Sequence, residues 1–448
     1  MNWNKLLSAQ RLEQKPKDIF DKDIERTQFQ RDYDRIIFSS PFRRLQNKTQ
    51  VFPLPGSVFV HNRLTHSLEV STVGRSLGTL LSAKLKQMEE YKDNIFIDEI
   101  GNIIGAACLA HDLGNPAFGH SGEMAISQYF LDNEAIYRPK LNNQQWNDII
   151  HFEGNANAFR ILTHNFYGRP ESQFTLTYST LATLIKYPCT SLSAGDKSKV
   201  YLKKYGFFEP EESTFRKIAD QLGMIELSGN PSIFYRHPLS FLLEAADDIC
   251  YNVIDIEDAH RLNIFSLEKV YSLLLPLLGD DPKATKERME KLIDDNDKVS
   301  LLRAKVIGIL VTKCFNAFWE NHEAIMAGKL DKDLKSCLDI STQNHLKIIE
   351  KESIKYIYNH KTVLEKEIAG YRIIGGLLEE FIPAVLSQNQ NKHYNNKLLQ
   401  LIPIQFTPTS TDDYSKILSM LDFLSGMTDL YAVELYRKIK GISFPEMS

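Results

Sequence analysis

Cysteine is scarce in this sequence, and the few cysteines present do not form pairs. The five cysteines of the 448-residue chain are scattered and include no C-x-x-C motif. An odd number of isolated thiols argues against a disulfide framework and against a zinc site built on thiolates. We therefore expect ordinary buried thiols in a reducing compartment for Cys108, Cys189, Cys250, Cys314 and Cys337.

Long hydrophobic runs are also missing. The N-terminus, MNWNKLLSAQRLEQKPKD, has no apolar stretch of signal-peptide length, and nothing later approaches the ~18 apolar residues of a membrane span. Neither sign of charge is in excess, since 53 basic and 57 acidic residues give a formal net charge of -4. This balance argues against a general attraction to nucleic acid or to anionic membrane. We expect a cytoplasmic protein without membrane contact.

Alternating strand patterns are rare, and most of the chain has helical periodicity instead. Apolar residues recur at steps of three and four, which is the spacing of an amphipathic helix. VFPLPGSVFV (51–60) is one candidate for a short hairpin, because its prolines suit edge positions. With 43% hydrophobic residues the chain can bury a large core. The helical patterns cover 64–85, 238–262, 266–278 and 301–326.

These patterns predict an all-α fold with one large helical body and a small, more irregular C-terminal subdomain that starts near residue 330. Three polar stretches are expected on the surface. The stretch 137–148 contains a proline and 387–397 is rich in Asn and Gln, so both are predicted as loops. The charged stretch 279–300 is predicted as a short helix between turns.

The stretch AACLAHDLGNPAFGHSGE (106–123) carries more ionisable groups than a core helix needs. An apolar run ends there at His111 and Asp112, and LGNP then closes the predicted helix. Adjacent helical residues point about 100° apart, so both side chains can reach one point beyond the helix end. An imidazole and a carboxylate at such a point suit a divalent metal. An isolated His–Asp pair is nevertheless more often a helix-end histidine beside a capping carboxylate.

Two further residues strengthen the metal hypothesis. His66 begins an amphipathic helix in NRLTHSLEV, and Asp247 lies in the largely apolar LLEAADDICYNVIDIED. Buried carboxylates are costly unless they are paired or metal-bound, so an embedded Asp247 indicates a pocket wall. Tyr251 and Asp255 follow at i+4 and i+8 on the same helix face. A solvated acidic edge would explain Asp255 alone, but it fits Asp247 poorly.

The order H…HD…D resembles the HD-domain metal-dependent phosphohydrolases. Flanking segments narrow this resemblance to the deoxyguanosine triphosphate triphosphohydrolases. It implies an HD-domain core that includes the N-terminal substrate-binding segment in 1–330, and a C-terminal helical subdomain that completes the pocket and the subunit contacts in 331–448. The segments that carry the resemblance span nearly the whole chain: FRRLQNKTQVFPL (42–54), NRLTHSLEV (62–70), HDLGNPAFGHSGE (111–123), HFEGNANAFRIL (151–162), LIKYP (184–188), ADDICYNVIDIEDA (246–259) and SGMTDLYAVELYRKIKGI (425–442).

A metal centre and a reaction follow from the resemblance. The ligands of the implied metal centre would hold one divalent ion. Mn and Mg are the expected ions, and Fe, Co and Ni also suit two imidazoles and two carboxylates. The implied reaction is hydrolysis of dGTP, or of other dNTPs, to the deoxynucleoside and inorganic tripolyphosphate by attack of water at the α-phosphorus. The implied ligands are His66, His111, Asp112 and Asp247.

The leaving group of such a reaction is a strongly basic 5′-alkoxide, so a general acid is worth about 10²–10⁴-fold in rate. His120 lies in a glycine-flanked stretch just past the His–Asp pair, and Glu123 three residues on could orient its imidazole. The family assigns these two roles to the positions that match His120 and Glu123. Without the resemblance, His120 would be interpreted as a surface histidine.

The resemblance also implies a substrate pocket. Lys186 and Lys204 match positions that meet the phosphates, although solvated surface lysines have the same appearance in a sequence. Tyr251 and Asp255 resemble residues that meet the sugar, where the ring would crowd a 2′-hydroxyl and the carboxylate would accept from the 3′-hydroxyl. Gln50 resembles a residue at the base end, where its amide could read a nucleobase edge. The alternative for Gln50 is a surface glutamine in a polar turn.

Other interpretations use the same residues. One is an HD phosphodiesterase or nucleotidase for a cyclic or alarmone nucleotide, which would not need Gln50, Tyr251 or Asp255. Another is a nucleotide or single-stranded-DNA sensor with a regulatory metal site, although mild acidity argues against nucleic acid as the main ligand. The family often forms hexamers, so a homo-oligomer is expected. Arg437 could reach the substrate or a neighbouring subunit.

Overall fold

The computed structural model describes residues 1–12, 26–53, 60–169, 174–230, 232–279, 282–386 and 392–443 as a helical assembly. Within these ranges no strand forms, and β-type pairing is limited to isolated bridges such as Thr49 with Asn62. The prediction of an all-α fold is therefore confirmed. None of the described helices is long and apolar enough to cross a membrane.

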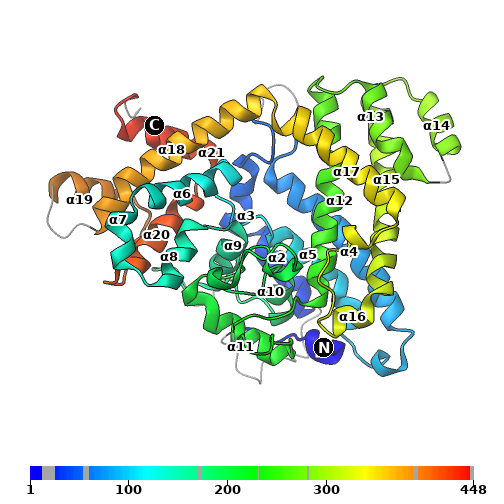
Figure 1. Ribbon diagram of the computed structural model, residues 1–448, viewed down its shortest axis with the longest axis horizontal. Helices are drawn as coiled ribbons and strands as arrows, with labels where there is room; N and C mark the ends of the chain where they lie inside the picture. Colours follow the sequence, from blue (N-terminus) through cyan, green and yellow to red (C-terminus); the bar gives the residue numbers. More distant parts are fainter. Residues whose placement is uncertain are drawn as a thin grey trace.

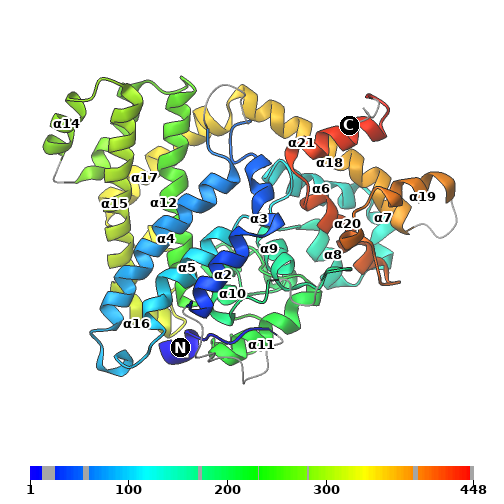
Figure 2. The ribbon, with the colours of Figure 1, turned by 180° about the vertical axis from the view of Figure 1, so that it is seen from behind.

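The core is built on four long helices: α4 (Arg63–Leu85), α5 (Ile100–Ala110), α12 (Pro238–Arg261) and α15 (Asp295–Glu320). Apart from Asn102 in its first turn, helix α5 is apolar on every side, and from Ile103 onward it is fully buried between its neighbours. Figures 1 and 2 show α4, α5 and α12 between the α15 side of the molecule and the C-terminal helices.

Helices α4 and α5 approach closely because glycines remove side chains from their interface. A Cβ added at Gly74 would lie 2.7 Å from Cys108 Sγ, and one added at Gly78 would lie 2.7 Å from the Cα of Gly101. Neither position could accept a larger residue without moving a helix. Close packing of these two helices places His66 near the end of α5.

Further helices surround this core. The N-terminal ones are α1 (Trp3–Leu6), α2 (Gln28–Ile37) and α3 (Ser40–Arg44). The middle of the chain forms α6 (His120–Asp132), α7 (Glu134–Tyr137), α8 (Asn143–Ile150), α9 (Gly154–Thr163), α10 (Tyr178–Leu184), α11 (Glu212–Leu222), α13 (Leu267–Leu274), α14 (Pro282–Glu290) and α16 (His322–Met326). The C-terminal helices are α17 (Ile340–Glu352), α18 (Lys361–Leu386), α19 (Lys392–Gln400), α20 (Asp413–Ser425) and α21 (Asp429–Ile439).

Two of the predicted loops are wrong. The stretch 137–148 is mostly helical, because Asn142 and Gln145 form a capping box that starts α8, and Trp146 then packs into the core. Residues 392–397 of the Asn-rich stretch belong to α19, which is anchored by the buried Leu398. Polar composition thus concealed short helices that bury one or two apolar residues each.

The charged stretch 279–300 contains the short helix α14, and its end starts α15 behind the cap of Asp294. Residues 54–59 of the predicted hairpin and 387–391 of the Asn-rich stretch lie outside the described residues. The division of the chain near residue 330 stays a prediction.

A buried ion network ties the C-terminal helix α20 to the middle of the chain. Arg160 on α9 donates from Nη2 to Asp422 on α20 at 2.9 Å, and from Nη1 to Glu211 at 2.6 Å. All three side chains are buried. Burial raises the pKa of Glu211 to about 7, while Arg160 opposes that rise. The arginine is therefore the group that allows two carboxylates to share the interior.

Replacing Arg160 with methionine should destabilise the protein strongly. Removing one partner of a buried ion pair leaves uncompensated charge and typically costs about 3–5 kcal/mol. Lys140→Met is the matched control, because Lys140 also reaches α20, through an ion pair with Asp413 in which both side chains are at least 30% exposed. Exposed pairs contribute about 0–1 kcal/mol. Urea unfolding should separate the two variants, and equal midpoints would contradict the role of Arg160.

Candidate active site

Three helices position the residues that were singled out as metal ligands. His111 caps the C-terminus of α5 and Asp112 lies in the following turn, whereas His66 lies in the first turn of α4. Asp247 lies midway along α12. Because α4, α5 and α12 pack against one another, residues far apart in sequence are brought to one place. We call His66, His111, Asp112 and Asp247 the His–Asp cluster.

The four side chains of the His–Asp cluster gather around one point. Candidate ligand atoms of His66, His111 and Asp112 all lie within 4.8 Å of one another. Asp247 Oδ1 lies 3.2 Å from His66 Nε2 and 3.6 Å from His111 Nε2. The distance from His111 Nε2 to Asp112 Oδ1 is 3.7 Å. Two imidazoles and two carboxylates at this spacing suit a divalent metal.

His111 supports this interpretation with an unused nitrogen. Its Nδ1 lies 2.6 Å from the carbonyl oxygen of Cys108, and a carbonyl only accepts, so Nδ1 carries the proton. Its Nε2 is buried and has no hydrogen-bond partner among the described residues. A buried lone pair without a partner is unfavourable, and a metal ion would satisfy it. The donor set therefore fits a metal ion.

Two cations balance the carboxylates of the cluster. Lys186 Nζ donates to Asp247 Oδ2 at 2.8 Å, and Arg63 Nη1 donates to Asp112 Oδ2 at 2.9 Å. Burial acts to raise the pKa of Asp247, but Lys186 and the imidazoles hold that pKa well below its usual range. Arg63 and the imidazoles lower the pKa of Asp112 in the same way against burial. Both carboxylates are thus kept ionised, as ligands must be.

Arg63 was not singled out in the sequence, although it lies in the NRLTHSLEV segment, one helical turn before His66. The side chain of Lys186, by contrast, is only 10% exposed, so its interpretation as a surface lysine is wrong. Both cations stand beside the His–Asp cluster. Arg63 and Lys186 are identified as part of the site by their ion pairs with Asp112 and Asp247, and a sequence pattern does not show such ion pairs.

His120 is the first residue of α6 and not part of a loop. Its Nδ1 lies 2.8 Å from Glu123 Oε2, and Glu123 Oε1 accepts from the backbone N–H of Gly154 at 2.7 Å. The hydrogen bond that His120 donates to the Glu123 carboxylate raises the pKa of the imidazole, with burial opposing. The His120 imidazole is 75% exposed, whereas the Glu123 carboxylate is buried. The hydrogen bond of Glu123 to the Gly154 backbone fixes this carboxylate, and the carboxylate in turn orients an imidazole that solvent can reach.

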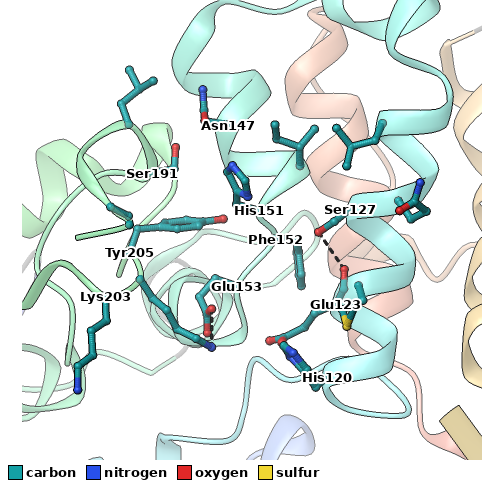
Figure 3. A pocket seen from close by; sticks show the side chains of 18 of the residues that line it. His120, Glu123, Ser127, Asn147, His151, Phe152, Glu153, Ser191, Lys203 and Tyr205 are labelled. Atoms are coloured by element: carbon teal, nitrogen blue, oxygen red, sulfur yellow. Dashed lines mark hydrogen bonds and ion pairs between the residues drawn. The ribbon is translucent and has the colours of Figure 1, made fainter. Parts of the chain in front are cut away.

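A cavity of about 550 Å³ opens beside His120. Figure 3 shows His120 and Glu123 on one helix, with Glu153 and Tyr205 on other elements around the same space. The residues of the His–Asp cluster are not among those that line it in the described part of the chain. The lining includes His120, Glu123, Met124, Gln128, Asn147, His151, Phe152, Glu153, Ser191, Lys203, Lys204, Tyr205 and Tyr371.

Lys204 lines this cavity and is held by a carboxylate that sequence reasoning missed. Its Nζ lies 2.8 Å from Glu153 Oε2, and the two side chains are 43% and 8% exposed. Burial and the neighbouring Glu123 raise the pKa of Glu153, while Lys204 opposes the rise. Glu153 belongs to the HFEGNANAFRIL segment, where a single glutamate before Gly154 gave no separate signal.

The proposed sugar residues carry partners from the C-terminal part of the chain. Tyr251 accepts from Lys335 Nζ at 3.3 Å, and the hydroxyl of Tyr358 donates to Asp255 Oδ2 at 2.7 Å. Burial raises the pKa of Asp255 to about 6, with Tyr358 opposing. Asp255 is buried, so it is not a solvated acidic edge. Lys335 and Tyr358 could not be found from sequence, because nothing in it indicates their distant partners.

Gln50 and Arg437 lie apart from these contacts. Gln50 is half-buried, and its Oε1 is enclosed without a hydrogen-bond partner among the described residues. It follows Thr49, which pairs with Asn62 at the start of α4, so the Gln50 segment is joined to the helix that carries His66. Arg437 is exposed in the last turn of α21.

An all-α scaffold whose core helices converge on a His–Asp cluster defines a protein of the HD-domain type with a candidate metal site. No family model matches the chain, but whole proteins do. A deoxyguanosinetriphosphate triphosphohydrolase-like protein of Synechocystis is 38% identical over 99% of this chain and 100% of its own length. One from Pseudomonas aeruginosa is 38% identical with the same coverage, and a deoxyguanosinetriphosphate triphosphohydrolase of Yersinia enterocolitica is 30% identical over 98% of this chain and 99% of its own length. The chain therefore belongs to the deoxyguanosinetriphosphate triphosphohydrolase family.

Manganese should raise the thermal unfolding midpoint of the protein. An ion that binds only the folded state stabilises it by mass action, about 2.7 kcal/mol at a hundred times its Kd. His111→Ala should abolish this shift, because it removes the nitrogen that faces the cluster. His151→Ala, which changes an imidazole in the cavity lining, should keep it. Melting each protein with and without Mn²⁺ tests the site, and equal shifts in both variants would place the ion elsewhere.

Proposed function

We propose that the protein hydrolyses dGTP to deoxyguanosine and inorganic tripolyphosphate. Other dNTPs are further candidate substrates, and a substrate panel would rank their rates of hydrolysis. The observation that carries the proposal is the His–Asp cluster with Lys186 and Arg63 beside it, in a chain that matches this family from end to end. The names of the relatives point to the same substrate.

In this proposal His66, His111, Asp112 and Asp247 hold the metal, with Mn or Mg preferred. When bound, a divalent ion would lower the pKa of a coordinated water and neutralise phosphate oxygens. Lys186 and Arg63 add positive charge at the same place, so the phosphate chain meets cations that are already ordered. Because both are held by carboxylates in advance, little side-chain entropy is lost when the substrate binds.

His120 gives its proton to the departing 5′-oxygen. A new bond forms between the water oxygen and the α-phosphorus, and the bond from that phosphorus to the 5′-oxygen breaks. The hydrogen bond to Glu123 orients the imidazole and stabilises its protonated form, as a general acid requires. The cavity beside His120 and Lys204 accepts the far end of the triphosphate.

Deoxyribose is selected at the other end of the substrate. The ring of Tyr251 occupies the space a 2′-hydroxyl would need, and Asp255 accepts from the 3′-hydroxyl while Tyr358 fixes its orientation. The enclosed Oε1 of Gln50 is available for a donor on a nucleobase edge. Hexamer formation and control by single-stranded DNA or a second nucleotide remain predictions.

With dGTP and Mn²⁺, chromatography should detect deoxyguanosine and tripolyphosphate. dGMP with pyrophosphate, or dGDP with phosphate, would reject the cleavage position, and GTP should react more slowly than dGTP. His120→Ala should lower kcat by about 10²–10⁴-fold, because it removes a general acid. That variant should still show the Mn²⁺-dependent melting shift. Binding of single-stranded DNA without turnover of any dNTP would favour the sensor interpretation.

The kcat/KM should fall as the pH rises through the pKa of His120, because the general acid must be protonated. Glu123 raises that pKa, so the enzyme keeps its proton to a higher pH than a free imidazole would. Glu123→Gln removes the negative partner and should move the alkaline limb to lower pH. Asp132→Asn, further along α6 and hydrogen-bonded only to Gln128 in the described contacts, should leave the limb in place. A limb that does not move in the Glu123 variant would contradict the pairing.

A further inference from the structure

Asp429, the first residue of α21, contacts two segments of the proposed active site at once. Its Oδ1 accepts from the backbone N–H of Phe118 at 2.9 Å. Its Oδ2 accepts from the backbone N–H of Thr49 at 3.0 Å and from the hydroxyl of the same residue. One carboxylate thus joins the turn before His120 to the residue before Gln50.

The turn before His120 has a backbone conformation that needs support. Phe118 has a φ of 63° and Gly119 a φ of 61°. A bulky residue in this left-handed region is strained and persists only where surrounding structure holds it. His120 follows directly, so the direction in which α6 begins depends on how this turn is held.

The side chain of Phe118 is held as well as its backbone. A Cβ added at Gly370 on α18 would lie 2.8 Å from the Cβ of Phe118, so the two elements are in direct contact. Phe118 is buried there. The C-terminal helices therefore fix this turn through α18, by packing, and through α21, by the Asp429 hydrogen bond.

The second segment is connected to α4. Thr49 pairs with Asn62, and the backbone N–H of Arg63 donates to the carbonyl of Lys48 at 3.1 Å. Asn62 caps the helix that bears His66. The Asp429 carboxylate therefore stands between the start of α4 with its attached Gln50 segment and the start of α6 with His120.

We propose that Asp429 is a positioning residue that sets the distance and orientation between the general acid and the nucleobase-reading segment. This inference rests on the proposed function. A carboxylate is suited to the task, because its two oxygens accept from backbone donors on opposite sides, while asparagine offers only one oxygen. Contacts of an ionised acceptor are also stronger than neutral ones.

We call the hydrogen bonds from Thr49 and Phe118 to the Asp429 carboxylate the clamp. The clamp can be tested without measuring turnover. In Asp429→Ala and in Asp429→Asn, amide hydrogen exchange should accelerate about 10-fold or more in peptides that cover 113–123 and 46–52, since both lose an acceptor. Asp413→Ala is the matched control, because Asp413 is the first residue of the neighbouring helix α20 and pairs only with Lys140 at 3.2 Å in the described contacts. Unchanged exchange in both Asp429 variants overturns the clamp.

The positioning role of Asp429 is tested by steady-state kinetics with the metal site fully occupied. The Mn²⁺-dependent melting shift of each variant verifies that occupancy. Asp429→Asn should lower kcat by about 10²-fold, as misplacement of a catalytic group by about 1 Å does. The ratio of kcat/KM for dGTP to that for dATP should fall too, because the Gln50 segment is released. Faster exchange with unchanged kcat and unchanged base preference overturns the positioning role.

These results separate the clamp from the proposed function. If the wild-type protein releases no tripolyphosphate from any dNTP, the proposed function fails and the positioning role fails with it, while the exchange data still decide whether Asp429 clamps the two segments. If the wild type is active and Asp429→Asn resembles Asp413→Ala in all measurements, only the inference about Asp429 is overturned.

Discussion

Two imidazoles and two carboxylates lie among apolar helices, three of them buried and Asp247 half-buried, and the rest of the structure depends on how this charge is accommodated. Lys186 and Arg63 each donate to one of the aspartates, and they keep both ionised against the effect of burial. A charge in such surroundings persists only when it is paired or metal-bound. The same arrangement leaves His111 Nε2 without a hydrogen-bond partner among the described residues, which is the feature that a metal ion would satisfy.

Residues of the C-terminal part of the chain hold side chains and turns that lie earlier in the sequence. Tyr358 donates to Asp255 on α12, Asp422 pairs with the buried Arg160, and Asp429 reaches Thr49 and the turn before His120. Each contact is polar and largely enclosed, so its loss would leave an unsatisfied group behind. Deletion of the C-terminal helices would therefore disturb the site itself as well as its surroundings.

Sequence patterns predicted α4, α12 and most of α15, which bury apolar stripes, but they did not single out α18, which is as long as α15. They missed α8 and α19, where a cap and one or two buried apolar residues were hidden by polar neighbours. Asp247 was found because it stands in an apolar context, and the order H…HD…D, which resembles that of the HD-domain phosphohydrolases, joined it to His66, His111 and Asp112. Arg63, Glu153 and Tyr358 were not found, because arginine and glutamate usually lie on the surface and tyrosine lies there often, so their residue types alone do not indicate a site.

The sequence by itself determined the all-α class, the membership in the family and the set of residues that meet in the His–Asp cluster. Local periodicity and motif order are properties of neighbouring residues, so they can be read along the chain. Only the tertiary structure decided which cation pairs with which carboxylate, that Lys186 is buried, and that α21 supports the turn before His120. These depend on contacts between residues that lie 49, 61 and 311 positions apart, and no local pattern contains them.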